Sequence, residues 1–173
     1  MNIFTKSALA VLLSAGIAQA GDYMFGDLKI EHPRAFETAQ NAKVGGGYMT
    51  ITNSGSADDT LVEVRVVNIP RIELHLSETD ANGVATMTKQ EGGILVPAGE
   101  TVTLKPGGLH VMFMGLGDDP FEVGEQISAT LVFKQAGEID IAFAVEARTA
   151  GDHGAMKHGD HGTMNHSGET KSD

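Results

Sequence analysis

The sequence predicts an all-β fold, a Greek-key-like β-sandwich. Short runs of alternating apolar and polar residues, or of β-branched residues, recur through most of the 173-residue chain. Turn residues such as Gly, Pro, Asn and Asp separate these runs. Residues 21–148 show no sustained helical spacing of apolar side chains. Many short strands divided by such turns are typical of sandwiches and barrels.

The first half of this body predicts a series of strands that ends in a hairpin. The strands are Leu28–Glu31, Gly47–Asn53, Thr60–Val67, Arg71–Leu76 and Val84–Lys89. The turn Asp80-Ala-Asn-Gly83 separates the last two of them, and such a turn favours antiparallel pairing of its flanking strands.

The second half continues the same pattern. Its expected strands are Ile94–Val96, Thr101–Leu104, His110–Met114, Ile127–Lys134 and Ile139–Val145. The turns between them contain Pro97-Ala-Gly-Glu100, Pro106-Gly-Gly108 and residues 115–120.

The two ends of the chain differ from this body. Lys6, the apolar run Ala8–Ile17 and the small-x-small sequence Ala18-Gln19-Ala20 predict a secretory signal peptide cleaved near Ala20. We therefore expect a leader over residues 1–20, a folded domain over 21–148 and a periplasmic location. Residues 149–173 offer almost nothing to bury, which predicts a disordered tail.

Composition excludes several classes of function. The chain has no cysteine, so it can form no disulfide, thiol nucleophile or type 1 blue-copper site. Its formal net charge of −11 argues against binding to nucleic acid or to anionic membrane surfaces. The apolar run of the leader is too short to span a bilayer, and we expect no stable membrane insertion.

Histidine and methionine form the most informative pattern. His110, Met112 and Met114 alternate with Val111 and Phe113, so they share one face of a strand. A lone strand methionine is usually a core residue, and a lone strand histidine is more often hydrogen-bonded than a ligand. Together, imidazole and thioether without thiolate favour copper(I) over ions that prefer oxygen.

His75 and Met87 belong to the predicted hairpin. Glu73 and His75 alternate with the apolar Ile72 and Leu74, which places His75 on the opposite face from these core residues. Met87 lies in the next strand, where the hairpin brings it beside His75. We expect the site near the rim of the sandwich, exposed enough for direct transfer of the metal.

These residues lie in segments that resemble the PCu(A)C family of periplasmic copper chaperones over Leu28 to Val145. The segments are Glu73-Leu-His75, Gly83-Val84-x-x-Met87, Val96-Pro-Ala-Gly99, Leu104-Lys-Pro-Gly-Gly108 and His110-x-Met112-x-Met114-Gly-Leu116. The resemblance implies a cupredoxin-like fold and a Cu(I) site formed by His75, Met87, His110 and Met112. Met114 stays outside this ligand set.

The resemblance also implies the function. We expect a metallochaperone that delivers copper to an acceptor, such as the copper sites of a cytochrome c oxidase subunit or another copper chaperone. We expect it to be a monomer and not an enzyme, because no acid–base or nucleophile constellation is evident. The alternatives are a copper storage or detoxification protein and, more remotely, a copper enzyme.

The tail carries a second set of metal ligands. Two stretches align at an offset of eight residues, and their side chains are His153, Met156, His158, His161, Met164 and His166. Spaced imidazoles without fixed geometry suit Cu(II). We expect the tail to capture Cu(II) or to raise the local copper concentration near the folded site. A solubilising tail with incidental metal affinity is the alternative.

Overall fold

Strands make up all the regular secondary structure of the residues described in the computed structural model, 21–149. They are β1 (Tyr23–Phe25), β2 (Leu28–Phe36), β3 (Val44–Asn53), β4 (Asp59–Arg65), β5 (Arg71–Thr79), β6 (Ala85–Lys89), β7 (Ile94–Val96), β8 (Thr101–Leu104), β9 (Leu109–Met114), β10 (Gln126–Phe133) and β11 (Gly137–Glu146). The all-β prediction is confirmed. The predicted leader (1–20) and all but Thr149 of the predicted tail lie outside the described residues.

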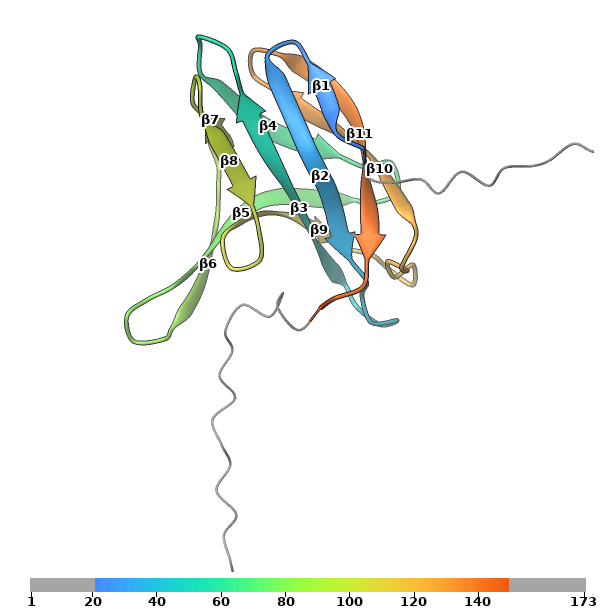
Figure 1. The fold of residues 1–173 in the computed structure, drawn as a ribbon. Helices are drawn as coiled ribbons and strands as arrows, with labels where there is room; N and C mark the ends of the chain where they lie inside the picture. The colour runs from blue at the N-terminus through green and yellow to red at the C-terminus, as the bar shows by residue number, and fades with distance from the viewer. Residues whose placement is uncertain (1–20, 150–173) are drawn as a thin grey trace, which may run out of the picture.

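Hydrogen-bonded ladders join the strands into one open sheet that folds over on itself (Figure 1). The order is β6-β5-β9-β3-β2-β11-β10-β4-β7, with β1 on β2 and β8 on β3. Strand β2 pairs in parallel with β11, whereas the other ladders are antiparallel. The first long strand, β2, lies beside the last strand, β11, and neighbours in the sheet do not follow the order of the chain. This arrangement is a Greek key and not a meander.

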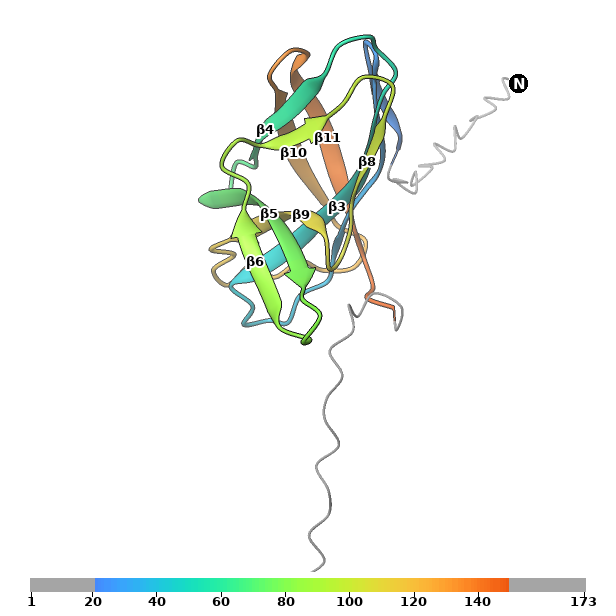
Figure 2. The same ribbon diagram turned by 90° about the vertical axis from the view of Figure 1, so that its left-hand side faces the viewer.

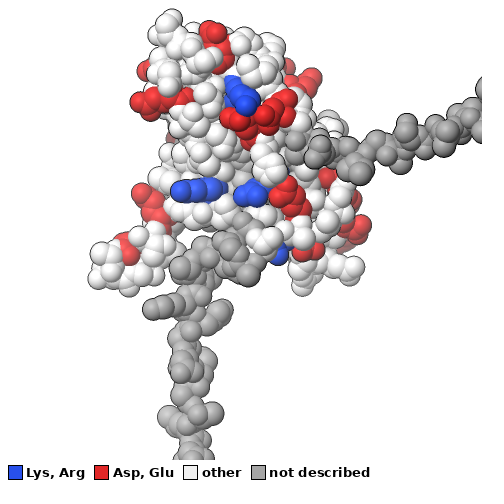
Figure 3. Space-filling view, in the orientation of Figure 1, with Lys and Arg blue, Asp and Glu red and all other residues white. Residues whose placement is uncertain are grey.

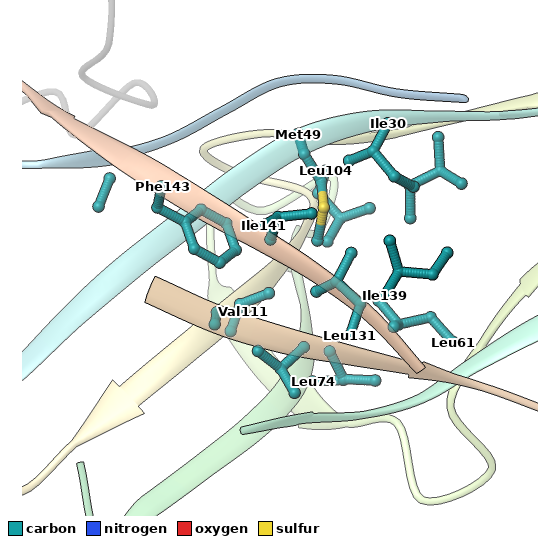
Figure 4. Packing of buried hydrophobic residues seen from close by; sticks show 14 of the residues in the cluster. Ile30, Met49, Leu61, Leu74, Leu104, Val111, Leu131, Ile139, Ile141 and Phe143 are labelled. Atoms are coloured by element: carbon teal, nitrogen blue, oxygen red, sulfur yellow. The ribbon is translucent and has the colours of Figure 1, made fainter. Parts of the chain in front are cut away.

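The core fills the space between the folded-over parts of the sheet (Figure 4). Alternation explains which side chains enter it, because in β11 the residues at every second position from Ile139 to Val145 are buried. Val111 and Phe113 enter it from β9, and both are fully buried. The opposite face of β9 is therefore left for His110 and Met112.

Each of the ten predicted strands is present, although β3 begins earlier than predicted, at Val44, and β5 continues further, to Thr79. Strand β1, which has only three residues, was not predicted. Strand β2 continues past Glu31 through Pro33, because a bulge between Glu31 and Arg34 takes His32 and Pro33 out of the ladder. His32 adopts φ 47°, and its Nε2 lies 3.1 Å from Oε1 of Glu146.

On the face drawn in Figure 3, acidic side chains are spread widely and basic ones lie among them instead of forming one patch. Lys29, for example, pairs with Glu31 at 2.6 Å. No helix long and apolar enough to cross a membrane occurs within residues 21–149.

Candidate metal centre

His75 and His110 lie directly opposite each other in the antiparallel β5–β9 ladder. Their ring centroids are 5.8 Å apart, and the ring planes are inclined by 60°. Opposite residues of a ladder project from the same face, so both imidazoles share one face of the sheet. Both side chains are nevertheless nearly buried, with His75 9% and His110 7% exposed. The two histidines are thus more enclosed than the sequence led us to expect of a rim site.

Both predicted sulfur ligands belong to the same face. Met112 follows His110 by two residues and is half-buried. Met87 lies in β6 opposite Ser77, which is two residues beyond His75. Diagonal neighbours of this kind are separated by about 7–8 Å between backbones, within reach of a long side chain. Met87 is 51% exposed, so its thioether is accessible to solvent.

A capped turn holds Met87 in this position. The β5–β6 hairpin projects from the body of the molecule (Figures 1 and 2). Oδ1 of Asp80 accepts hydrogen bonds from the backbone N–H groups of Asn82 at 2.9 Å and Val84 at 2.8 Å. Gly83 supplies the positive φ of 82° that closes the turn. The bond from Val84 is the main cause of a lowered pKa for Asp80.

His110 is fixed by a backbone carbonyl. Its Nδ1 lies 2.9 Å from the carbonyl oxygen of Gly108, in the turn that precedes β9. Because a carbonyl only accepts, Nδ1 carries the proton and Nε2 keeps its lone pair. Burial lowers the pKa of His110, which favours the neutral imidazole that a metal requires.

His75 is fixed by a carboxylate. Its Nε2 lies 2.8 Å from Oε2 of Glu73, and Glu73 is only 11% exposed. The other oxygen of Glu73 accepts from Nη2 of Arg71 at 2.8 Å and lies 3.6 Å from Nζ of Lys89. The bond with His75, followed by that with Arg71, lowers the pKa of Glu73 to about 2. Glu73 is therefore a carboxylate at neutral pH, and Nε2 of His75 donates to it.

The remaining ring nitrogen of His75 has no partner. Among the buried side-chain nitrogen and oxygen atoms of residues 21–149, Nδ1 of His75 is the one without a hydrogen bond. Buried polar atoms of native proteins are normally paired, so an unpaired one calls for an explanation. A bound metal ion is an explanation that fits an imidazole lone pair.

An aromatic row borders the two histidines. The ring of Tyr48 lies 6.5 Å from that of His110, and the ring of Phe36 lies 5.3 Å from that of Tyr48. The Tyr48 hydroxyl lies directly above Gly46, the residue opposite Met112 in the β3–β9 ladder. Only a residue without Cβ leaves room for the phenol there. Sequence reasoning missed both Tyr48 and Glu73, although alternation had already put Glu73 on the face of His75.

Other methionines lie elsewhere or at the margin. Met114 is half-buried on the face of Met112, opposite Arg71 and thus further from His75. Met49 is a core residue at 2% exposure, and Met24 is 67% exposed on β1. No group of three or more His, Asp or Glu side chains able to hold a metal occurs in the described part of the chain. The soft donors on this face are the imidazoles of His75 and His110 and the thioethers of Met87, Met112 and Met114.

Similar proteins share this architecture. A copper-bound PCuAC domain from PmoF2 is 30% identical and superimposes with a TM-score of 0.63, over 74% of this chain and 99% of that domain. An apo PCuAC domain from PmoF1 is 31% identical, with a TM-score of 0.62 over 74% of this chain and all of that domain (100%). The solution structure of Cu(I)-DR1885 from Deinococcus radiodurans is 25% identical, with a TM-score of 0.53 over 76% of this chain and 85% of that one.

Sequence comparison agrees with the structural one. A curated relative from Leifsonia xyli subsp. xyli, named "Putative lipoprotein Lxx21020", is 32% identical over 117 residues, which are 68% of this chain and 69% of the relative. The family model described as "Putative lipoprotein LpqE-like" matches residues 28–145. The chain belongs to the LpqE-like family, and its fold is that of the PCuAC domains.

Proposed function

We propose that this protein is a periplasmic copper metallochaperone that binds Cu(I) through His75, Met87, His110 and Met112. The observation that carries the proposal is the ladder pair of His75 and His110, with a methionine next to each histidine on the same face. The similarity to a copper-bound PCuAC domain and to Cu(I)-DR1885 supports copper as the cargo.

The ligand chemistry favours carriage over catalysis. Two imidazoles and two thioethers are neutral, and such a soft set prefers Cu(I) to Cu(II) and discriminates against oxygen-seeking ions. Thioethers need no deprotonation and cannot be lost to disulfides in an oxidising compartment. The exposed Met87 gives an acceptor protein a first sulfur to replace, while the buried histidines retain the ion. This division suits stepwise ligand exchange.

We infer the cellular setting from the sequence. A leader that ends near Ala20 would export the chain to the periplasm, and the lipoprotein names of its relatives support export. The acceptor is a copper-accepting protein, such as a cytochrome c oxidase subunit or another copper chaperone. The protein acts as a monomer and not as an enzyme.

A Cu(I) competition titration tests the folded site. The full chain is titrated anaerobically against a chromophoric Cu(I) chelator, next to its His75→Ala and Met112→Ala variants. Each substitution removes a ligand and is expected to weaken Cu(I) binding at least tenfold, or about 1.4 kcal/mol. Met24→Leu is the matched control, because Met24 is exposed on β1. Unchanged affinity in both ligand variants would refute the proposed site.

For the tail we propose Cu(II) binding by His153, Met156, His158, His161, Met164 and His166. The test replaces the four tail histidines by alanine in the full chain and measures Cu(II) stoichiometry. A fall in stoichiometry with unchanged Cu(I) affinity of the folded site supports the proposal. An unchanged stoichiometry refutes it and leaves a solubilising tail.

Storage is the competing function, and transfer kinetics distinguish it. A chaperone hands Cu(I) to a purified oxidase copper domain within seconds to minutes and holds one Cu(I) in its folded domain. A storage protein holds several ions and releases them slowly. The exposure of Met87 favours rapid exchange.

A further inference from the structure

We propose that Glu73 is a positioning residue that selects the ring nitrogens for copper: Nδ1 of His75 and Nε2 of His110. This inference rests on the proposed function, because it takes the two histidines as ligands. It adds an assignment of ligand atoms and a role for a residue that is not itself a ligand.

For His110 the choice of nitrogen follows from one contact. Nδ1 lies 2.9 Å from the carbonyl oxygen of Gly108 and donates to it. Gly108 is itself held in its turn, since its N–H donates to the carbonyl of Lys105 at 3.1 Å. Nε2 of this ring therefore keeps its lone pair available for a metal. Metal-binding histidines are commonly oriented by such a bond from the other ring nitrogen.

For His75 the same logic selects the opposite nitrogen. Nε2 is engaged by the carboxylate of Glu73 at 2.8 Å, which leaves the proton on Nε2 and the lone pair on Nδ1. Nδ1 is buried and has no hydrogen bond. A copper ion bound there would be shielded from water, and it would supply the partner that this nitrogen lacks.

Glu73 is firmly held in this role. Arg71 approaches its second oxygen with both Nε, at 3.1 Å, and Nη2, at 2.8 Å. Lys89, which faces His75 across the β5–β6 ladder, lies 3.6 Å from the same oxygen. If copper bound Nε2 of His75, Glu73 would have to leave that nitrogen while these cations still hold it in place. Binding through Nδ1 requires no such displacement.

Glu73 also contributes charge. The four proposed ligands are neutral, so the bound ion keeps its positive charge among largely buried side chains. A carboxylate hydrogen-bonded to a ligand histidine offsets this charge through the ring and makes the imidazole a better donor. Glu73 stands opposite Met112 in the β5–β9 ladder, so its charge lies beside the proposed site.

Imidazole nitrogen NMR tests the assignment. Long-range proton–nitrogen spectra are recorded on the uniformly ¹⁵N-labelled full chain, first without metal and then with Ag(I), a redox-inert analogue of Cu(I) whose nuclear spin couples to a bound nitrogen. The metal-free protein is expected to show the Nε2–H tautomer of His75 and the Nδ1–H tautomer of His110. With Ag(I), coupling is expected at Nδ1 of His75 and Nε2 of His110. Coupling at Nε2 of His75 overturns the proposal.

Variants of Glu73 test the positioning role. Glu73→Ala removes the acceptor, so the His75 tautomer is expected to become mixed and Cu(I) affinity to fall about 10–100-fold. Glu73→Gln keeps an oxygen acceptor and is expected to preserve the tautomer with a smaller loss of affinity. Glu91→Ala is the matched control, because Glu91 also pairs with Lys89, at 3.2 Å, but is 79% exposed. An unchanged tautomer in folded Glu73→Ala, checked by its amide spectrum, overturns the role of Glu73.

Failure of the nitrogen assignment can be distinguished from failure of the proposed metal site. If His75→Ala and Met112→Ala bind Cu(I) as tightly as the parent chain, the proposed metal site is wrong. If both lose affinity while Ag(I) couples to Nε2 of His75, the site stands and only the nitrogen assignment fails.

Discussion

His75 and His110 form a cross-strand pair whose rings are 5.8 Å apart, although the chain between them includes β6, β7 and β8. The pairing of β5 with β9 thus assembles the centre of the proposed site, and the β5–β6 hairpin adds Met87 to it. The site depends on a long-range ladder for its histidines and on a local turn for one methionine.

The first prediction follows from the proposal that His75 and His110 bind the same Cu(I) ion. If both histidines bind the same Cu(I), the loss of affinity in the double variant His75→Ala/His110→Ala will be smaller than the sum of the two single losses. Contacting residues typically show coupling of about 0.5–3 kcal/mol. Cu(I) competition titrations on all four proteins measure it. His32→Ala provides the control cycle with His75→Ala, since the His32 side chain is 57% exposed and pairs with Glu146. Additive losses for the His75/His110 cycle would contradict a shared ion.

Local patterns made the strands predictable, and also the face on which the proposed ligands of β9 lie. Alternation within β9 separates His110 and Met112 from the core residues Val111 and Phe113, and the structure confirms this division. The Asp80–Gly83 turn predicted the hairpin, which the structure also confirms. Both signals are encoded within a few adjacent residues.

Other features depend on distant parts of the chain and could not be predicted. No local pattern reveals that His75 faces His110, because ladder register is set by the whole folded sheet. The burial of both imidazoles has the same origin. The contact of Glu73 with Lys89 joins two strands, and the partner of His32 is Glu146, which ends the last strand.

The second prediction concerns the turn that positions Met87. Asp80→Ala removes the acceptor for the N–H groups of Asn82 and Val84. Every side chain of β6 is exposed, so no core packing compensates for the loss. We expect faster amide exchange in β6 and a several-fold weaker Cu(I) affinity, with little change in global stability. Hydrogen exchange followed by NMR measures the first effect. Protection of β6 equal to that of the parent chain would contradict this account.

The third prediction is the pH dependence of the same turn. The pKa of Asp80 is lowered below its ordinary 3.8 in the folded protein, chiefly by the hydrogen bond from Val84. A carboxyl with a lowered folded pKa stabilises the turn above its unfolded pKa, and this contribution is lost as the pH falls through the folded value. The amide signals of Asn82 and Val84 should therefore shift together below about pH 4. In Asp80→Asn the same signals should not titrate.

The fourth prediction tests the close packing beside β9, the strand of the proposed ligands His110 and Met112. A Cβ on Gly47 would lie 2.8 Å from the ring of Phe113 and 3.2 Å from that of Phe143. Both rings are fully buried, so moving either of them would disturb the close-packed core around it. Gly47→Ala should lower the free energy of unfolding by about 1–3 kcal/mol, as overpacking does. Gly92→Ala is the control, because a Cβ there meets no atom within 4 Å. Equal midpoints of urea unfolding for the two variants would contradict this packing.

The fifth prediction concerns Asp59, a buried carboxylate outside the proposed site. It is 5% exposed and accepts hydrogen bonds from the backbone N–H groups of Thr60 at 2.7 Å, Gln135 at 2.8 Å and Ala136 at 2.9 Å. These bonds tie the start of β4 to the turn between β10 and β11.

Alanine at this position leaves those N–H groups without their acceptor. Hydrogen bonds to charged groups contribute about 1.5–3 kcal/mol each, so Asp59→Ala should cost about 3 kcal/mol or more in urea unfolding. Asp59→Asn should also destabilise, because its amide NH₂ would face an N–H donor. Asp118→Ala, at a fully exposed position, should stay within about 0.5 kcal/mol of the parent. Cu(I) affinity should be unchanged in the folded fraction of each variant, since Asp59 touches none of the proposed ligands; a loss of affinity there would mean that β4 and the ligand strands are coupled.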